Sequence, residues 1–157
     1  MPVKRVTISG SRNLEADKLI VWRGLNDPGA LQFCIQNCQS LEQLDEHNFR
    51  AKFGIRIGPL KIGVGADLVV TPVSPPDHYQ LVCTVGTRIL GQAEAVADVK
   101  LTGHDAGTEV SFSARIDLKG RLSSYDEDFI SNAANRRLHL FFQSLQEWLN
   151  QGQLDLH

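Results

Sequence analysis

The strongest constraint on this chain is a long run of alternating apolar and polar residues between Phe49 and Leu118. A period of two is typical of strands with one buried and one solvated face. Short turn sequences divide the run, so the pattern predicts an antiparallel meander. Glycines on the outer face favour a strongly bent sheet. The alternating segments span residues 49–57, 60–70, 79–85, 89–101 and 110–118.

Shorter elements are predicted before this run. Asp27 is a good N-cap and Pro28 a good first helical residue, so a short helix should end near Cys34. The predicted elements are a strand over residues 3–9, helices over 16–25 and 28–34, and a strand over 38–44.

A long amphipathic helix is predicted over residues 125–150, because apolar side chains recur there at helical spacing. Ser124 and Glu127 have the spacing of a capping box, and Gly152 is a plausible stop. An apolar sheet face and an apolar helix stripe must cover each other. We therefore predict an α+β fold in which a curved antiparallel sheet wraps around the long C-terminal helix, as one domain over residues 1–157.

Composition excludes several classes of protein. Sixteen basic residues are scattered among eighteen acidic ones, so no basic face for nucleic acid is expected. No apolar stretch approaches the roughly 20 residues needed to span a bilayer, and the N-terminus does not resemble a secretory signal. Three cysteines cannot all pair within one chain, which favours a reduced, cytoplasmic setting.

No catalytic or metal-binding pattern stands out. Cys34 and Cys38 lack a second Cys or His pair for a zinc site, and buried small side chains explain them better. The histidines show no metal spacing. Tyr79 and Cys83 are the titratable or polar members of the predicted inner sheet face, so no catalytic residue, metal or cofactor is expected.

The predicted interior is rich in alanine, and two interpretations remain open from the pattern alone. Small side chains could let the helix sit close to the sheet over a solid core. Alternatively, they could leave a cavity for a hydrophobic small molecule. The small inner residues are Ala51, Ala66, Gly91, Ala93, Ala95, Ala97, Ala114, Ala133 and Ala134.

Several ordered motifs together resemble the carbon monoxide dehydrogenase CoxG family. The segment Val21–Pro28 resembles the family's opening, and further matches follow in the same order. They include Ile57–Lys61, the Pro75-Pro76-x-x-Tyr79 turn, Gly91, Leu101-Thr102, Gly107-Thr108, Gly120–Leu122 and Phe141-Phe142. The family usually has Pro-Gly between the two cysteines. Here Gln36-Asn37 stand there, and Asn37 can adopt the left-handed backbone that Gly would.

The resemblance implies membership of the START-like (SRPBCC), helix-grip superfamily, whose members hold hydrophobic ligands between a bent sheet and the C-terminal helix. It favours the cavity over the solid core. It also implies a role beside a molybdenum-containing CO dehydrogenase, with links to membrane attachment and to a quinone. We therefore expect a cytoplasmic protein, with peripheral contact at the inner face of the membrane left open.

The leading hypothesis is a non-enzymatic carrier of a hydrophobic small molecule such as a quinone or lipid. The alternative is a docking or assembly factor for a redox enzyme, with an exposed apolar patch built by Leu140, Phe142 and Trp148. An enzyme of this fold is the least favoured hypothesis. The predicted cavity wall consists of Trp22, Leu25, Phe53, Leu68, Leu81, Phe112, Leu138 and Phe141.

Overall fold

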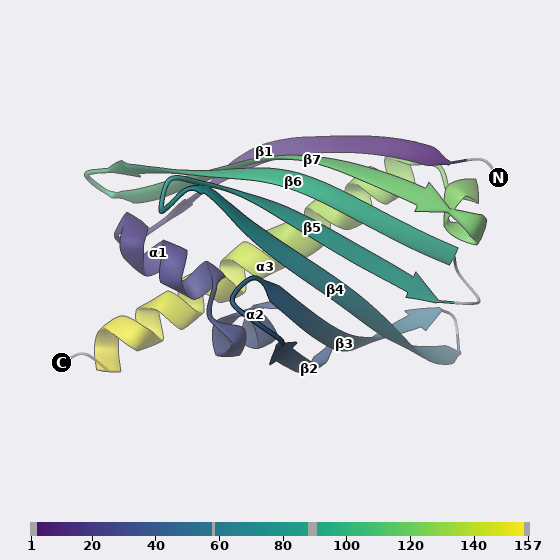
Figure 1. Ribbon diagram of the computed structural model, residues 1–157, viewed down its shortest axis with the longest axis horizontal. Helices are drawn as coiled ribbons and strands as arrows, with labels where there is room; N and C mark the ends of the chain where they lie inside the picture. The colour runs from purple at the N-terminus through teal and green to yellow at the C-terminus, as the bar shows by residue number, and fades with distance from the viewer. Residues whose placement is uncertain (1–2, 58, 88–90, 156–157) are drawn as a thin grey trace.

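A computed structural model describes residues 3–57, 59–87 and 91–155 (Figure 1). Its centre is a 7-stranded antiparallel sheet with the strand order β1-β7-β6-β5-β4-β3-β2. The predicted α+β architecture, a curved antiparallel sheet around a long C-terminal helix, is confirmed. The strands are β1 (Lys4–Leu14), β2 (Cys38–Gln43), β3 (Asn48–Ile57), β4 (Leu60–Ser74), β5 (His78–Thr87), β6 (Gly91–His104) and β7 (Gly107–Lys119).

The register of the strands keeps the predicted inner residues on one face. Cys83 lies opposite Ala95, which in turn lies opposite Ile116 on β7. Directly opposed residues of antiparallel strands share a face of the sheet. The alternation seen in the sequence therefore becomes one continuous apolar surface across the middle strands.

Two short helices, α1 (Lys18–Leu25) and α2 (Pro28–Cys34), follow β1. The predicted start of α2 is confirmed, because the Asp27 side chain accepts a hydrogen bond of 3.1 Å from the Ala30 amide. The sequence pattern predicts that α1 starts at residue 16. Asp17 has extended backbone angles, so the helix begins at Lys18 instead.

The C-terminal helix α3 (Glu127–Asp155) follows a short 3-10 helix, η1 (Gly120–Ser124), that the sequence pattern did not predict. The capping-box prediction is wrong, because the Ser124 hydroxyl donates to the Arg121 carbonyl within η1. Asp126 provides the first helical acceptor, for the Ile130 amide. Gly152 does not stop the helix, since a helical glycine costs only about 1 kcal/mol relative to alanine. With 29 residues, α3 is about 44 Å long.

Two further boundaries differ from the predictions. β1 extends to Leu14 rather than residue 9, because it pairs with β7 along its whole length. The predicted turn over residues 102–107 narrows to two residues between His104 and Gly107. Gly58 and Ile89, which the pattern places in a turn and on the inner face, lie outside the described residues.

The link between α2 and β2 contains the left-handed residue that the sequence predicted at Asn37. Asn37 has a φ of 59°, the left-handed conformation that glycine adopts most easily. In this position its carbonyl accepts a hydrogen bond from the Gly54 amide on β3. The asparagine therefore preserves the turn that leads into β2.

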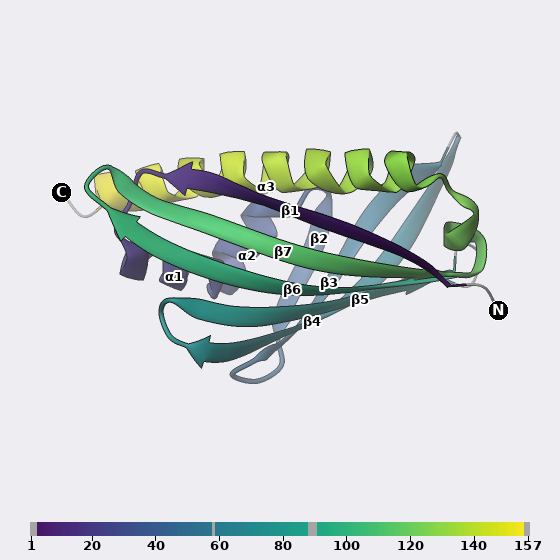
Figure 2. The same cartoon turned by 90° about the horizontal axis from the view of Figure 1, so that it is seen from above.

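α3 runs along the concave side of the sheet, with α1 near the C-terminal end of the helix and η1 near its start (Figures 1 and 2). The closed core lies at the α1 end. There α1, α2 and the second half of α3 pack against the sheet. Its largest members include Val21, Leu25, Leu31, Phe49, Tyr79, Val99, Leu101, Val110, Phe112, Phe142, Leu145 and Leu149.

Candidate ligand-binding site

The inner face of the sheet is closed at one end and open at the other. Towards the η1 end, many inner side chains of the middle strands and of the first half of α3 are only half-buried, although Val64, Ala66 and Leu118 are buried among them. We call the half-buried set the inner strip. It consists of Phe53, Leu68, Leu81, Cys83, Val85, Ala93, Ala95, Ala97, Ala114, Ile116, Ile130, Ala133, Ala134, Leu138 and Phe141.

The strip stays open because of side-chain size and the position of α3. The helix approaches α2, β1 and α1 most closely, so it crosses the middle strands at a greater distance. Alanines on β6 and α3 are too short to fill the space between them. Ala51, by contrast, is 1% exposed on the same face of the sheet. The strip is therefore an apolar surface on which a hydrophobic molecule could replace water.

The structure divides the predicted wall residues into two groups. Phe53, Leu68, Leu81, Leu138 and Phe141 lie on the inner strip from both sides. Trp22, Leu25 and Phe112, the remaining predicted wall residues, lie towards the closed end, where α1 packs.

In this second group, Trp22 is half-buried and meets Tyr79 edge-on, with ring centroids 5.2 Å apart. Leu25 and Phe112 are 6% and 8% exposed and belong to the closed core, where Phe112 stacks on Phe142. Trp22 and Tyr79 therefore lie where the closed core meets the strip. Val85, Ile116 and Ile130 are not among the predicted wall residues, although the same periodicity places them on it.

The titratable groups beside the strip are neutral at physiological pH. Burial raises the pKa of the Cys83 thiol to about 11, and the charge of Asp67 adds to the effect. Tyr79 is 5% exposed, and burial raises the pKa of its phenol above the ordinary value. The described side chains of this site suit a neutral, hydrophobic ligand, and among them there is neither an ionised base nor a thiolate nucleophile.

The remaining cysteines, Cys34 and Cys38, are free thiols. Burial raises the pKa of Cys34 to about 12, helped by the charge of Glu147, and burial also raises the pKa of Cys38. Thiolates are the form that binds metals. Within the described part of the chain, no three His, Cys, Asp or Glu side chains gather to hold a metal ion.

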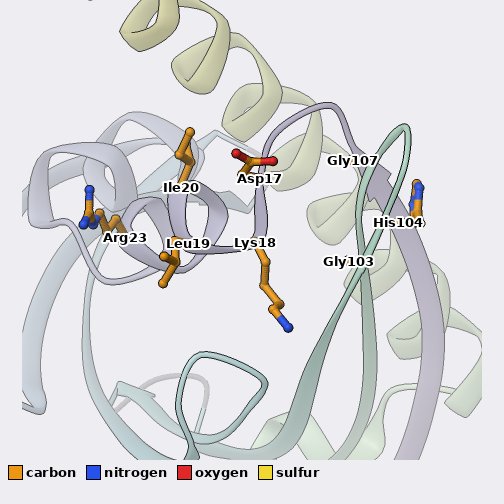
Figure 3. A pocket seen from close by; sticks show the side chains of 8 residues that line it. All are labelled: Asp17, Lys18, Leu19, Ile20, Arg23, Gly103, His104 and Gly107. Carbon is orange, nitrogen blue, oxygen red and sulfur yellow. The ribbon is translucent and has the colours of Figure 1, made fainter.

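A separate hollow of about 620 Å³ lies on the outside, between α1 and the β6–β7 hairpin (Figure 3). Its walls include Leu19, Ile20 and Arg23 from α1 and His104 from the hairpin. The polar side chains do not converge, because His104 points away from Arg23. Lys18 is engaged in an ion pair with Asp77 at 2.5 Å. The polar side chains of the hollow therefore form no cluster that could bind a ligand through several of them at once.

No helix within residues 3–57, 59–87 and 91–155 is both long enough and apolar enough to cross a membrane. Although α3 has sufficient length, polar and charged side chains interrupt its apolar stripe.

Comparison with known proteins agrees with this architecture. The family model of the carbon monoxide dehydrogenase protein CoxG matches residues 10–150. A conserved protein from Geobacillus kaustophilus shares 26% identity and a TM-score of 0.85, over 93% of this chain and 96% of its own. No curated protein matches the chain.

More distant solved structures share the fold. A putative uncharacterized protein from Rhizobium leguminosarum is 13% identical, with a TM-score of 0.72 over 96% of this chain and 97% of its own. The protein Ara h 8.0201 is also 13% identical, with a TM-score of 0.64 over 94% of this chain and 99% of its own. These likenesses confirm the predicted helix-grip class.

Proposed function

This chain belongs to the carbon monoxide dehydrogenase CoxG family, and we propose that it binds a neutral hydrophobic small molecule between its sheet and α3. The observation that carries the proposal is the half-buried inner strip, which is apolar on both walls. Leaving so much apolar surface open in the middle of a domain forfeits hydrophobic stabilisation, which a bound ligand would restore.

A quinone or another isoprenoid-like lipid is the ligand class that we favour. The strip is long, apolar and free of charged side chains, which suits an extended hydrocarbon tail. Near its closed end the neutral phenol of Tyr79 offers a hydrogen-bond donor that a carbonyl oxygen could use. In this role the protein would serve as an accessory carrier to a CO dehydrogenase-type oxidoreductase, in keeping with the family name.

The ligand is to be sought first in the protein as purified. Native mass spectrometry followed by organic extraction should release a quinone or lipid at near-equal stoichiometry. If the protein is empty, titration with decylubiquinone should raise its melting temperature, because a ligand that binds only the folded state stabilises it. The proposal would be contradicted if the purified protein is empty and decylubiquinone does not change its melting temperature.

A large side chain placed on the inner strip should block ligand binding without destabilising the fold. We expect Ala95→Phe to abolish the decylubiquinone-induced shift while changing the free energy of unfolding by less than about 1 kcal/mol. The matched control is Ala51→Phe, at a 1% exposed position on the same face. Overpacking there should cost about 1–3 kcal/mol or more. Equal destabilisation by the two substitutions, measured by urea denaturation, would indicate a solid core.

Docking to a redox enzyme is the second candidate function. The exposed patch predicted from Leu140, Phe142 and Trp148 is not formed as expected, because Phe142 is 8% exposed and packs on Phe112. Instead, Phe33 is 46% exposed, and its ring centroid lies 5.7 Å from that of Trp148. These two rings form an alternative apolar patch. Phe33→Ser should weaken co-purification of an oxidoreductase if this patch docks, and should leave decylubiquinone binding unchanged.

A further inference from the structure

Two aromatic side chains with hydrogen-bonding groups lie at the closed end of the inner strip. Trp22 from α1 and Tyr79 from β5 meet edge-on there, with Trp22 half-buried and Tyr79 5% exposed. Every fully buried side-chain nitrogen or oxygen of the described residues has a hydrogen-bond partner. Within those residues no partner meets the Tyr79 hydroxyl or the Trp22 indole nitrogen, so both groups remain accessible to water or to a ligand.

The rest of the strip offers little to a polar ligand atom. Cys83 is the one polar side chain among its members, and a thiol is a weak donor and a weak acceptor. The backbone groups of β5 and β6 are already paired with the neighbouring strands. No carboxylate, amide or imidazole belongs to the strip, so its described members include no strong hydrogen-bond acceptor.

The aromatic pair at the closed end provides more donors than acceptors. An indole N–H donates and cannot accept, whereas a phenol hydroxyl can do both. Burial raises the pKa of Tyr79 above its ordinary value, so the hydroxyl keeps its proton at neutral pH. A ligand oxygen that accepts can therefore bond to either ring. A ligand hydroxyl that donates finds only the Tyr79 oxygen among these two groups.

The two redox forms of a quinone differ in this same property. The carbonyl oxygens of the oxidised form only accept hydrogen bonds, whereas the reduced quinol carries two O–H donors. On the strip, one quinol O–H is left without an acceptor even if the other bonds to Tyr79, and an unpaired donor is costly when water is excluded. An unpaired carbonyl is tolerated more readily than an unpaired donor. The strip is therefore better suited to the oxidised form.

We propose that the Trp22–Tyr79 pair makes the strip selective for the oxidised form of a quinone, with a ring carbonyl at the two aromatic donors and the tail along the strip towards η1 (Figure 1). The inference rests on the proposed function and adds to it a preferred redox state and a direction of the bound molecule. A carrier with this preference takes up an oxidised electron acceptor and does not retain the reduced product. That property suits the supply of an acceptor to an oxidoreductase.

The two redox forms of one ligand test this preference. The full chain is titrated anaerobically by calorimetry with decylubiquinone and with decylubiquinol. We expect the quinone to bind at least about tenfold more tightly, because the quinol retains an unpaired donor. Tighter binding of the oxidised form lowers the midpoint potential of the bound couple. For a two-electron couple, a tenfold ratio corresponds to about 30 mV, which redox titration of the complex checks independently.

Substitutions of the two rings separate affinity from redox preference. Trp22→Phe removes a group that only donates, so it should weaken quinone binding about threefold or more and quinol binding less, which narrows the ratio. Tyr79→Phe removes a hydroxyl that donates to the quinone or accepts from the quinol, so it should weaken both. Tyr125→Phe removes a hydroxyl at the η1 end and should change neither affinity. Melting curves of the unliganded variants verify folding.

An added acceptor tests the direction of the bound molecule. Ala97 pairs with Leu81, one inner position along the sheet from the Tyr79–Val99 pair, so it lies near the expected ring. Ala97→Ser gives a quinol O–H a hydroxyl acceptor and should narrow the ratio. The matched variant Ala93→Ser, on the same strand nearer the η1 end, should lower both affinities alike and keep the ratio.

The outcomes distinguish this inference from the proposed function. Equal binding of the two redox forms, or tighter binding of the quinol, would overturn the inference and leave the carrier function in place. A ratio unchanged in both Trp22→Phe and Ala97→Ser would also overturn it. Equal narrowing in Ala97→Ser and Ala93→Ser would contradict the proposed direction. If neither form binds, the proposed function itself fails, and the redox preference fails with it.

Discussion

Individual side chains on the inner face differ more in their surroundings than in their chemistry. Phe53 and Phe112 are both phenylalanines that point from the sheet towards α3. Phe112 is 8% exposed and stacks on Phe142, whereas Phe53 is half-buried on the inner strip. The apolar area that each removes from water, and the cavity that each would leave, therefore differ.

Truncating these two rings should have different costs. We expect Phe112→Ala to lower the free energy of unfolding by about 3–5 kcal/mol, because it empties a packed site. Phe53→Ala should cost less than about 2 kcal/mol, because its ring already borders open space. Urea denaturation of both variants measures the difference. A cost for Phe53→Ala as large as that for Phe112→Ala would mean that the strip is closed in solution.

Among the elements, the connection from β1 to α1 depends on one buried hydrogen bond. Thr108 on β7 is 0% exposed, and its hydroxyl donates to the Ala16 carbonyl at 2.7 Å. The neighbouring Gly107 has a φ of 142°, and a Cβ there would lie 2.1 Å from the Leu14 carbonyl oxygen. This close approach lets β1 turn into α1 directly beside the β6–β7 hairpin.

Removing the Thr108 hydroxyl should loosen this connection. Thr108→Val keeps the shape but leaves the Ala16 carbonyl without its donor, at a cost of about 1–3 kcal/mol. Thr108→Ser retains the hydroxyl and should restore most of that loss, apart from the missing methyl group. Thermal or urea unfolding compares the two variants. Equal stability of the valine and serine variants would show that the hydrogen bond contributes nothing.

At the scale of the whole molecule, the sheet has one closed and one open half. Val99 and Leu101 on β6 lie in the closed core, Ala97 packs against its edge, and Ala93 and Ala95 lie further out on the strip. Both halves of the strand are paired with β5 and β7. Differences in local stability along β6 must therefore arise from apolar cover rather than from backbone hydrogen bonding.

Hydrogen exchange should show this gradient along a single strand. We expect amides at residues 99–101 to exchange at least about tenfold more slowly than those at 93–97, because local opening of the uncovered half costs less free energy. Added decylubiquinone should slow exchange mainly at 93–97. Uniform protection along β6, unchanged by the quinone, would contradict the division into two halves.

The boundary between the two halves could be predicted from the sequence only in part. Alternation places Leu81, Phe53 and Phe112 on the inner face, and helical spacing places Leu138 and Phe141 opposite them. The spacing does not say where α3 crosses the sheet. The pattern therefore groups Leu25 and Phe112 on the same wall as Phe53, although they lie in the closed core. Phe129, which belongs to the apolar stripe of the helix by its spacing, is 57% exposed.

Local chemistry by itself determined the order of the elements, the apolar face of the sheet, the start of α2 at Pro28 and the left-handed turn at Asn37. Each depends on residues close together in the chain, where backbone sterics and alternation act directly. Only the tertiary structure decided how far β1 pairs with β7, where α3 starts and ends, and which apolar side chains remain uncovered. Those features depend on contacts between residues far apart in sequence, whose distances no local pattern encodes.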